Sequence, residues 1–191
     1  WHGHDVVAVL SRIGKVAAAT TATTLIERFG VSRIVFTGVA GGLAPQVNVG
    51  DVVVAREFIQ HDMDASPLFP RHEVPLTGMT RFVADIALSD ALAAAAPLAM
   101  QDMLATLPSS EWLNLDLAKA QVHQGLIASG DRFVSGAAEL HGLQQRLLAP
   151  GEVLYVCPMC PCVARESVSC AHRRRTRTHG GLAPKNHGAG S

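Results

Sequence analysis

Short apolar runs alternate with longer stretches of helical period along residues 1–156. The run at 5–10 is rich in valine and short, so it predicts a buried strand rather than a helix. Residues 13–29 place apolar side chains near one face at the 3.6-residue period, and this predicts a helix that ends at Gly30. A second buried strand is predicted at 33–37. This order is a βαβ unit, which predicts a parallel sheet.

The same pattern continues to about Val156. We predict strands at 52–55, 122–129 and 152–156, a helix at 80–96 that Pro97 ends, and a helix at 137–148. The stretch 59–78 has no regular period and is too long for a casual connection, so we expect it to be functional or mobile. The elements together predict an α/β protein.

The last part of the chain differs from the rest in composition. We divide the chain into a folded domain at 1–156 and a divergent tail at 157–191, which holds all 4 cysteines and a cluster of arginines and is predicted to be mostly disordered. A reading-frame shift would produce such a tail. The alternative is a zinc module built on Cys157-x-x-Cys160, Cys162, Cys170 and His172, but no hydrophobic core accompanies these ligands. We favour the frame shift.

Charge and hydropathy narrow the class of partner. The formal net charge is +0 with no long block of like charges, which argues against nucleic-acid binding and favours a small-molecule partner. No apolar run approaches the length of a bilayer span, and residues 1–5 lack the pattern of a signal peptide, so we expect no membrane partner and a cytoplasmic location. The chain starts at Trp1 without a Met, so we expect that its natural N-terminus is missing.

Two short motifs are candidates for chemistry. Gly38-Val-Ala-Gly-Gly42 follows the carboxyl end of a predicted strand, where open α/β sheets bind their ligands. The alternative is a tight turn with no ligand. His61-Asp-Met-Asp64 offers an imidazole and two carboxylates, but such a cluster in a loop more often makes local caps and turns, so we predict no metal site.

Three stretches occur in the order found in a known enzyme family. They are Ser11-Arg-Ile-Gly-Lys-Val-Ala-Ala-Ala19, Thr37-Gly-Val-Ala-Gly-Gly-Leu-Ala-Pro45 with the Val-Gly-Asp-Val-Val-Val run that follows it, and Gly125-Leu-Ile-Ala-Ser-Gly-Asp-Arg-Phe-Val134. In these stretches the chain resembles the 5′-methylthioadenosine/S-adenosylhomocysteine nucleosidases. The resemblance implies a three-layer α/β/α nucleoside phosphorylase-like fold with a mixed central sheet, here incomplete at both ends. It also implies an adenine nucleoside as substrate, methionine salvage as the role, and no cofactor.

The resemblance carries over to six residues that would line the substrate. It implies that Phe133 stacks on the purine, that the main chain of Val134 hydrogen-bonds the purine edge, and that Ile13 lies near the sugar. The backbone at Val39, Ala40 and Gly41 would approach the ligand closely. The alternative for Phe133 and Ile13 is an ordinary place in the hydrophobic core. Similar enzymes are homodimers, and the resemblance places Phe69 and Pro75 near the neighbouring subunit.

Breaking an N-glycosidic bond needs an acid for the leaving purine, a base for water and negative charge near the sugar. The family supplies these from a Ser-Asp motif, a glutamate near the N-terminus and a Met-Glu pair. None of them has a match here, since Cys157-Pro-Met159 follows Val156, so we name no catalytic residue and expect weak or no turnover. A nucleoside phosphorylase of the same fold is less favoured, because Phe36 stands where related phosphorylases have arginine. A non-catalytic adenine-nucleoside binder is the third hypothesis.

Overall fold

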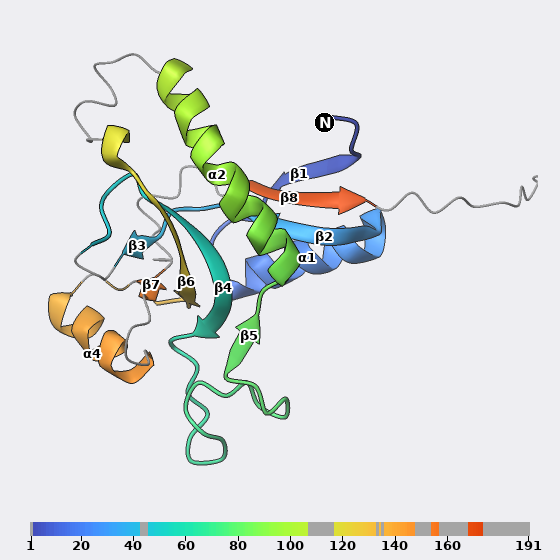
Figure 1. The fold of residues 1–191 in the computed structure, drawn as a ribbon. Helices are drawn as coiled ribbons and strands as arrows, with labels where there is room; N and C mark the ends of the chain where they lie inside the picture. The colour runs from blue at the N-terminus through green and yellow to red at the C-terminus, as the bar shows by residue number, and fades with distance from the viewer. Residues whose placement is uncertain are drawn as a thin grey trace, which may run out of the picture.

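The computed structural model describes residues 2–42, 46–106, 117–132, 134, 136–147, 154–156 and 168–173. Within these ranges the strands form two sheets, and helices pack against them (Figure 1). The helices are α1 (Lys15–Phe29), α2 (Ile86–Thr106), α4 (Ala137–Leu147) and the short 3₁₀ helix η1 (Leu117–Lys119). The strands are β1 (Val6–Leu10), β2 (Val31–Phe36), β3 (Gly41–Gly42), β4 (Val52–Gln60), β5 (Arg81–Val83), β6 (Val122–Ser129), β7 (Leu154–Val156) and β8 (Val168–Arg173).

The larger sheet is mixed and runs in the order β3-β7-β6-β4-β5. Strand β6 pairs in parallel with β4 on one side and β7 on the other, whereas β3 and β5 are antiparallel edges. Helix α4 covers β6 and β7, and together they bury one hydrophobic core: Ile59, Leu126, Ala128, Val134, Leu143, Leu147 and Val156. The α/β class and the mixed sheet are therefore confirmed.

The smaller sheet departs from the predicted βαβ unit. Its order is β1-β8-β2, with β8 antiparallel to both neighbours, so β1 and β2 run in the same direction but are not adjacent. Strand β8 lies within the stretch 157–191, and the prediction that most of this stretch is disordered stays a prediction. Strand pairing uses main-chain N–H and C=O groups, so it does not require an apolar pattern in the added strand. The domain boundary at Val156 stays a prediction.

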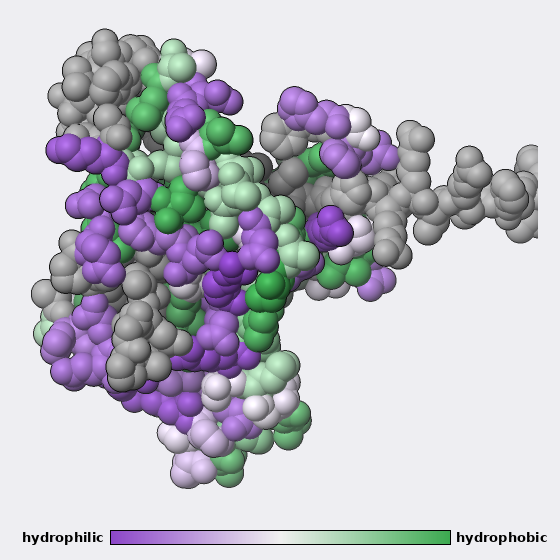
Figure 2. Space-filling view, viewed as in Figure 1, coloured by the Kyte–Doolittle hydropathy of each residue, from purple (hydrophilic) through white to green (hydrophobic). Residues whose placement is uncertain are grey.

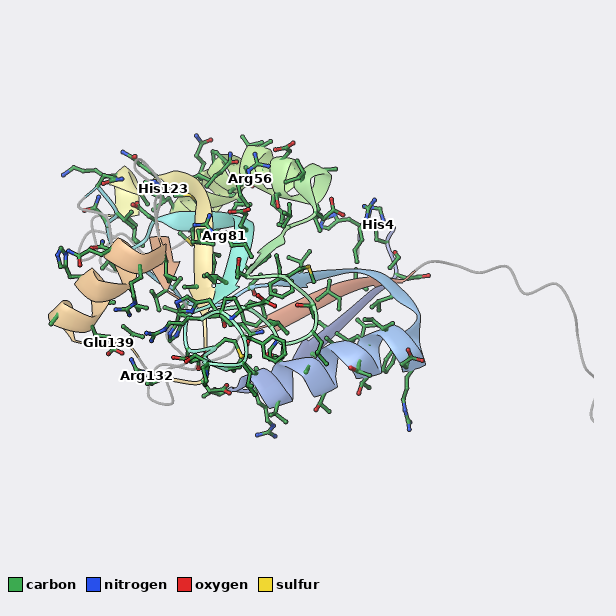
Figure 3. All side chains as sticks on the ribbon, turned by 90° about the horizontal axis from the view of Figure 1, so that it is seen from below. His4, Arg56, Arg81, His123, Arg132 and Glu139 are labelled. Carbon is green, nitrogen blue, oxygen red and sulfur yellow. The ribbon has the colours of Figure 1, made fainter. Side chains whose placement is uncertain are left out.

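Helices α1 and α2 lie on opposite sides of the strands, which gives the layered arrangement of an α/β/α fold (Figures 1 and 3). Helix α1 packs on the smaller sheet through a second core, in which Leu25 and Val31 are buried against Val7 and Val9. Gly30 takes a left-handed conformation with φ of 60°, and its N–H bonds Ile26 O. The predicted end of this helix is confirmed.

The helix predicted at 80–96 begins and ends later than expected. Arg81–Val83 form the edge strand β5, and Asp85 caps α2 by accepting a hydrogen bond from Leu88 N at 3.0 Å. The helix then continues through Pro97 to Thr106. Pro97 is exposed and lies in an alanine-rich stretch, so strong helix propensity on both sides offsets the cost of the proline.

Apolar side chains are exposed along α2, where Figure 2 shows a green surface. Leu98 is 65% exposed and Met103 is 41% exposed. None of the helices in the described ranges has the length and hydropathy needed to cross a membrane.

Candidate active site

The carboxyl ends of β4 and β6 meet the first turn of α1. Lys15, the first residue of α1, donates from its Nζ to Asp62 Oδ1 at 2.9 Å and to Gln60 Oε1 at 3.4 Å. Its main-chain N donates to Asp131 Oδ1 at 2.7 Å. Asp62 and Asp131 follow β4 and β6 directly, so these contacts bring three segments that are distant in sequence to one edge of the fold.

Asp62 is the electrostatic centre of this edge. Its side chain is 16% exposed, and its second oxygen, Oδ2, accepts a hydrogen bond from Asp131 N at 2.6 Å. Burial raises the pKa of Asp62, but the hydrogen bonds from Lys15 and Asp131 outweigh burial and leave this pKa below its ordinary value. Asp62 is therefore a stable anion in the folded protein.

The turn after β6 is closely packed. His61 N bonds Ser129 O at 3.0 Å, which joins the ends of β4 and β6. At Gly130 an added Cβ would stand 2.6 Å from His61 Nε2 and 2.7 Å from Asp62 Cγ, so only glycine fits. The side chain of Val134 then enters the core and is 6% exposed. Both ends of the turn 129–134 are thus anchored.

The glycine-rich turn reaches the same edge through β7. Gly41 pairs with Val156 in the β3–β7 ladder, and Val156 pairs with Ala128 in the β7–β6 ladder. Neighbouring strands lie about 4.8 Å apart, so Gly41 stands roughly 10 Å from Ala128, the residue before Ser129. The backbone of Gly41 comes near Val156 O, which an added Cβ would meet at 3.7 Å.

The substrate-lining residues predicted from the sequence differ in exposure. Ile13 is 43% exposed and Val39 is 60% exposed, Ala40 is half-buried and Gly41 is exposed. Because the side chain of Val134 is in the core, only its main chain remains for a ligand. Phe133 lies outside the described residues, so its predicted stacking role stays a prediction.

Ile13 follows a residue with an unusual backbone conformation. Arg12 has φ of 60°, a left-handed value that is uncommon for residues other than glycine. Such values concentrate at functional turns. The side chain of Arg12 is exposed, so a cation stands beside Ile13 at the start of α1.

The carboxylates of the His61-Asp-Met-Asp64 motif point to different partners. Asp64 accepts hydrogen bonds from Ser66 Oγ at 2.6 Å and Ser66 N at 3.2 Å, and lies 3.6 Å from Arg71 Nε. Asp62 turns instead to Lys15 and Asp131. In the described ranges no three His, Cys, Asp or Glu side chains stand together as metal ligands.

Two histidines are buried near these carboxylates: His61, which begins the motif, and His72, which follows it in the chain. His61 is 3% exposed and His72 is 9% exposed, and burial is the main cause that lowers the pKa of each. His72 N bonds Met63 O at 2.9 Å, and His72 Nδ1 lies 3.2 Å from Gln60 O. Both rings therefore favour the neutral form, and the His61 ring lies against Gly130.

Sequence reasoning missed the polar residues that organise this edge: Lys15, Gln60, Asp62 and Asp131. A usable signal was present for three of them, since Gln60 ends β4 and Asp62 and Asp131 come just after the carboxyl ends of β4 and β6, and the carboxyl ends of parallel neighbours meet at one edge of a sheet. The partners of each residue could not be known without the register of the strands.

Comparison with known proteins agrees with this architecture. A 5′-methylthioadenosine/S-adenosylhomocysteine nucleosidase of Anoxybacillus flavithermus is 36% identical over 140 residues, which are 72% of this chain and 52% of the relative. An aminodeoxyfutalosine nucleosidase of Helicobacter pylori is 29% identical over 178 residues, covering 88% of this chain and 69% of the relative. This chain spans about half the length of the first of these relatives.

A solved structure gives the same picture. The 5′-methylthioadenosine/S-adenosylhomocysteine nucleosidase of Neisseria meningitidis, in complex with methylthio-immucillin-A, superposes with a TM-score of 0.58 at 32% identity, over 75% of this chain and 54% of that chain. The family model of the phosphorylase superfamily matches residues 1–150. The chain therefore belongs to the phosphorylase superfamily.

Proposed function

We propose that the protein is a purine nucleosidase that hydrolyses the N-glycosidic bond of 5′-methylthioadenosine and S-adenosylhomocysteine and releases adenine. One observation carries the proposal: the three stretches that resemble the nucleosidases converge at one edge of the fold. Lys15 bonds Asp131 and Asp62, and the β3–β7–β6 ladders bring Gly41 to the same edge. Relatives that bear the nucleosidase name support the reaction class.

The exposed residues at this edge suit a flat ring with polar margins. Ile13 and Val39 offer apolar surface, and Gly41 allows the main chain to come near a ligand. We assign purine stacking to Phe133 and hydrogen bonding of the purine edge to the main chain of Val134. A Phe133→Ala variant should weaken adenine binding about fivefold or more, since a stacked aromatic contributes about 1 kcal/mol or more. Unchanged affinity in a folded variant would place Phe133 in the core.

The charges near the turn favour water over phosphate as the nucleophile. Phosphate is held by cations and N–H donors that are free to bind it. Here Lys15 is engaged by Asp62, and Arg132 lies against Glu139 (Figure 3). Asp131 also occupies the first main-chain N–H of α1, where an anion would bind. Phe36, 54% exposed, supplies no cation at the end of β2.

A phosphate-dependence assay separates the three hypotheses. The purified chain is incubated with methylthioadenosine, with and without phosphate, and released adenine is measured by chromatography beside adenine binding by calorimetry. We expect weak binding and slow adenine release that phosphate does not accelerate. Release that requires phosphate would establish a phosphorylase, to which exposed Arg12 could contribute a cation. Binding with no release would leave a non-catalytic binder, and no binding at all would contradict the proposal.

The proposal extends to assembly, role and location. We propose a homodimer in which the stretch 59–78 meets a second copy. Leu68 is 84% exposed and Leu76 is 91% exposed, and apolar surface of this kind is typical of a partner contact. Sedimentation should show a dimer, and a monodisperse monomer would contradict it. We also propose a role in methionine salvage, which the resemblance to the nucleosidases implies, and a cytoplasmic location.

A further inference from the structure

Three charged residues close a ring between three segments of the chain. Lys15 N donates to Asp131 Oδ1 at 2.7 Å, Asp131 N donates to Asp62 Oδ2 at 2.6 Å, and Lys15 Nζ donates to Asp62 Oδ1 at 2.9 Å. Each residue is therefore bonded to both others. Lys15 Nζ also stands 4.0 Å from Asp131 Oδ2, so one ammonium faces two carboxylates.

The ring stands between the segments to which the proposed function assigns substrate contacts. Ile13 is two residues before Lys15, and Phe133 and Val134 come shortly after Asp131. Asp62 bridges these segments, because its Oδ1 accepts from Lys15 and its Oδ2 accepts from Asp131. It is also the least exposed of the three, at 16% against 32% for Lys15 and 50% for Asp131.

One main-chain donor inside the turn depends on the same carboxylate. Val134 anchors one end in the core, and Ser129 anchors the other through His61 N. Between these anchors, Asp131 N is held only by Asp62 among the bonds that the structure describes. None of the ring residues belongs to either hydrophobic core. Removal of the carboxylate should therefore loosen the turn without unfolding the domain.

We propose that Asp62 is a positioning residue, which holds the purine-facing turn 129–134 against the start of α1 so that both present one preformed surface to the nucleoside. This inference rests on the proposed function. Asp62 touches no reacting atom in this scheme. Because Asp62 keeps the turn ordered before the ligand arrives, it lowers the entropic cost of binding.

The test uses the full chain and three variants. Asp62→Asn keeps the shape and one acceptor but cannot accept from both Lys15 and Asp131, and Asp62→Glu restores the carboxylate on a longer stem. Asp64→Asn is the matched control, because it makes the same chemical change two residues away on a side chain that is 42% exposed. Thermal unfolding identifies a temperature at which every variant is folded.

Two measurements are then made at that temperature. Amide exchange in the unliganded protein reports the turn directly: we expect exchange in 129–134 to rise about tenfold in Asp62→Asn, the equivalent of one net hydrogen bond of about 1.4 kcal/mol. Adenine affinity by calorimetry should fall by a similar factor, with partial recovery in Asp62→Glu. Asp64→Asn should leave both unchanged.

The outcomes separate this inference from the proposed function. Unchanged exchange in Asp62→Asn would overturn the inference whatever the ligand does. Faster exchange with unchanged adenine affinity would overturn it too, because the order of the turn would then have no effect on adenine binding. If the parent chain bound no adenine, the proposed function would fail, and the exchange result would still decide whether Asp62 holds the turn.

Discussion

Among the carboxylates that form ion pairs in this structure, Asp51 should cost the most stability when it is changed to the amide. Asp51 lies at the amino ends of β4 and β6, the edge opposite the candidate site. Its side chain is 2% exposed, and its two oxygens accept from Asn48 N, Gln121 N and His123 Nε2, each at 2.8 Å. A carboxylate only accepts, so His123 donates from this nitrogen.

The expected magnitude follows from the donors that would be left without an acceptor. In Asp51→Asn one oxygen remains and the new NH₂ group faces N–H donors. A buried donor without a partner costs about 1–3 kcal/mol. Asn48 is exposed and can bind water instead, whereas His123 is 14% exposed and cannot do so fully. We expect the free energy of unfolding to fall by about 2–3 kcal/mol.

Urea unfolding followed by circular dichroism at pH 7 measures this loss. Asp90→Asn is the control, since Asp90 pairs with Arg56 at 2.6 Å but is 59% exposed, and such a pair contributes about 0–1 kcal/mol. Figure 3 shows the labelled side chains of Arg56 and His123. If Asp51→Asn costs no more than Asp90→Asn, the reasoning from burial is refuted.

The stability effect of Asp51→Asn has a pH dependence of known sign. Burial raises the pKa of Asp51, but the bonds from Asn48, Gln121 and His123 together bring it below its ordinary value of 3.8. The contribution of Asp51 is therefore full above pH 3.8 and is lost as pH falls through the lower pKa of the folded state. The stability difference between the parent and Asp51→Asn should shrink in that acid range.

Three further predictions concern the turn, the core and the buried histidines. Gly130→Ala should cost about 1–3 kcal/mol by overpacking against His61, whereas Gly136→Ala, whose Cβ would meet its nearest neighbour at 3.9 Å, should be nearly neutral in urea unfolding. Leu143→Ala should cost about 2–5 kcal/mol, because this side chain is 2% exposed in the core of α4, and a loss below 1 kcal/mol would contradict that core. The pKa values of His61 and His72 lie below 6.5, so the unfolded chain binds more protons and stability should fall as pH drops below 6.5; a flat profile between pH 7.5 and 5.5 would be inconsistent with neutral buried rings.

Local signals in the sequence determined several elements correctly. The end of α1 at Gly30 followed from the freedom of glycine to take positive φ, and β6 followed from an apolar run of the right length. The glycine-rich turn was placed correctly after a strand because residues near in sequence decide it. The missed N-cap at Asp85 was also a local signal, and reading it would have started α2 at the right place.

Tertiary structure decided what depends on residues far apart. The ring joins Lys15 to Asp131 across 116 residues, and its geometry depends on the parallel register of β4 and β6. The insertion of β8 between β1 and β2 follows from unpaired strand edges, which main-chain groups fill whatever side chains they carry.

The candidate site divides in the same way. The sequence by itself predicted the segments that we propose to face the ligand, through the resemblance to the nucleosidases and through the glycine-rich turn at a strand end. It did not determine that Asp62 holds them together, because a loop carboxylate between a histidine and a methionine looks like many solvated turns. Only the folded chain brings Lys15 and Asp131 to its two oxygens, since a hydrogen bond depends on distances of about 3 Å, which the register of β4 and β6 and the packing of α1 set together.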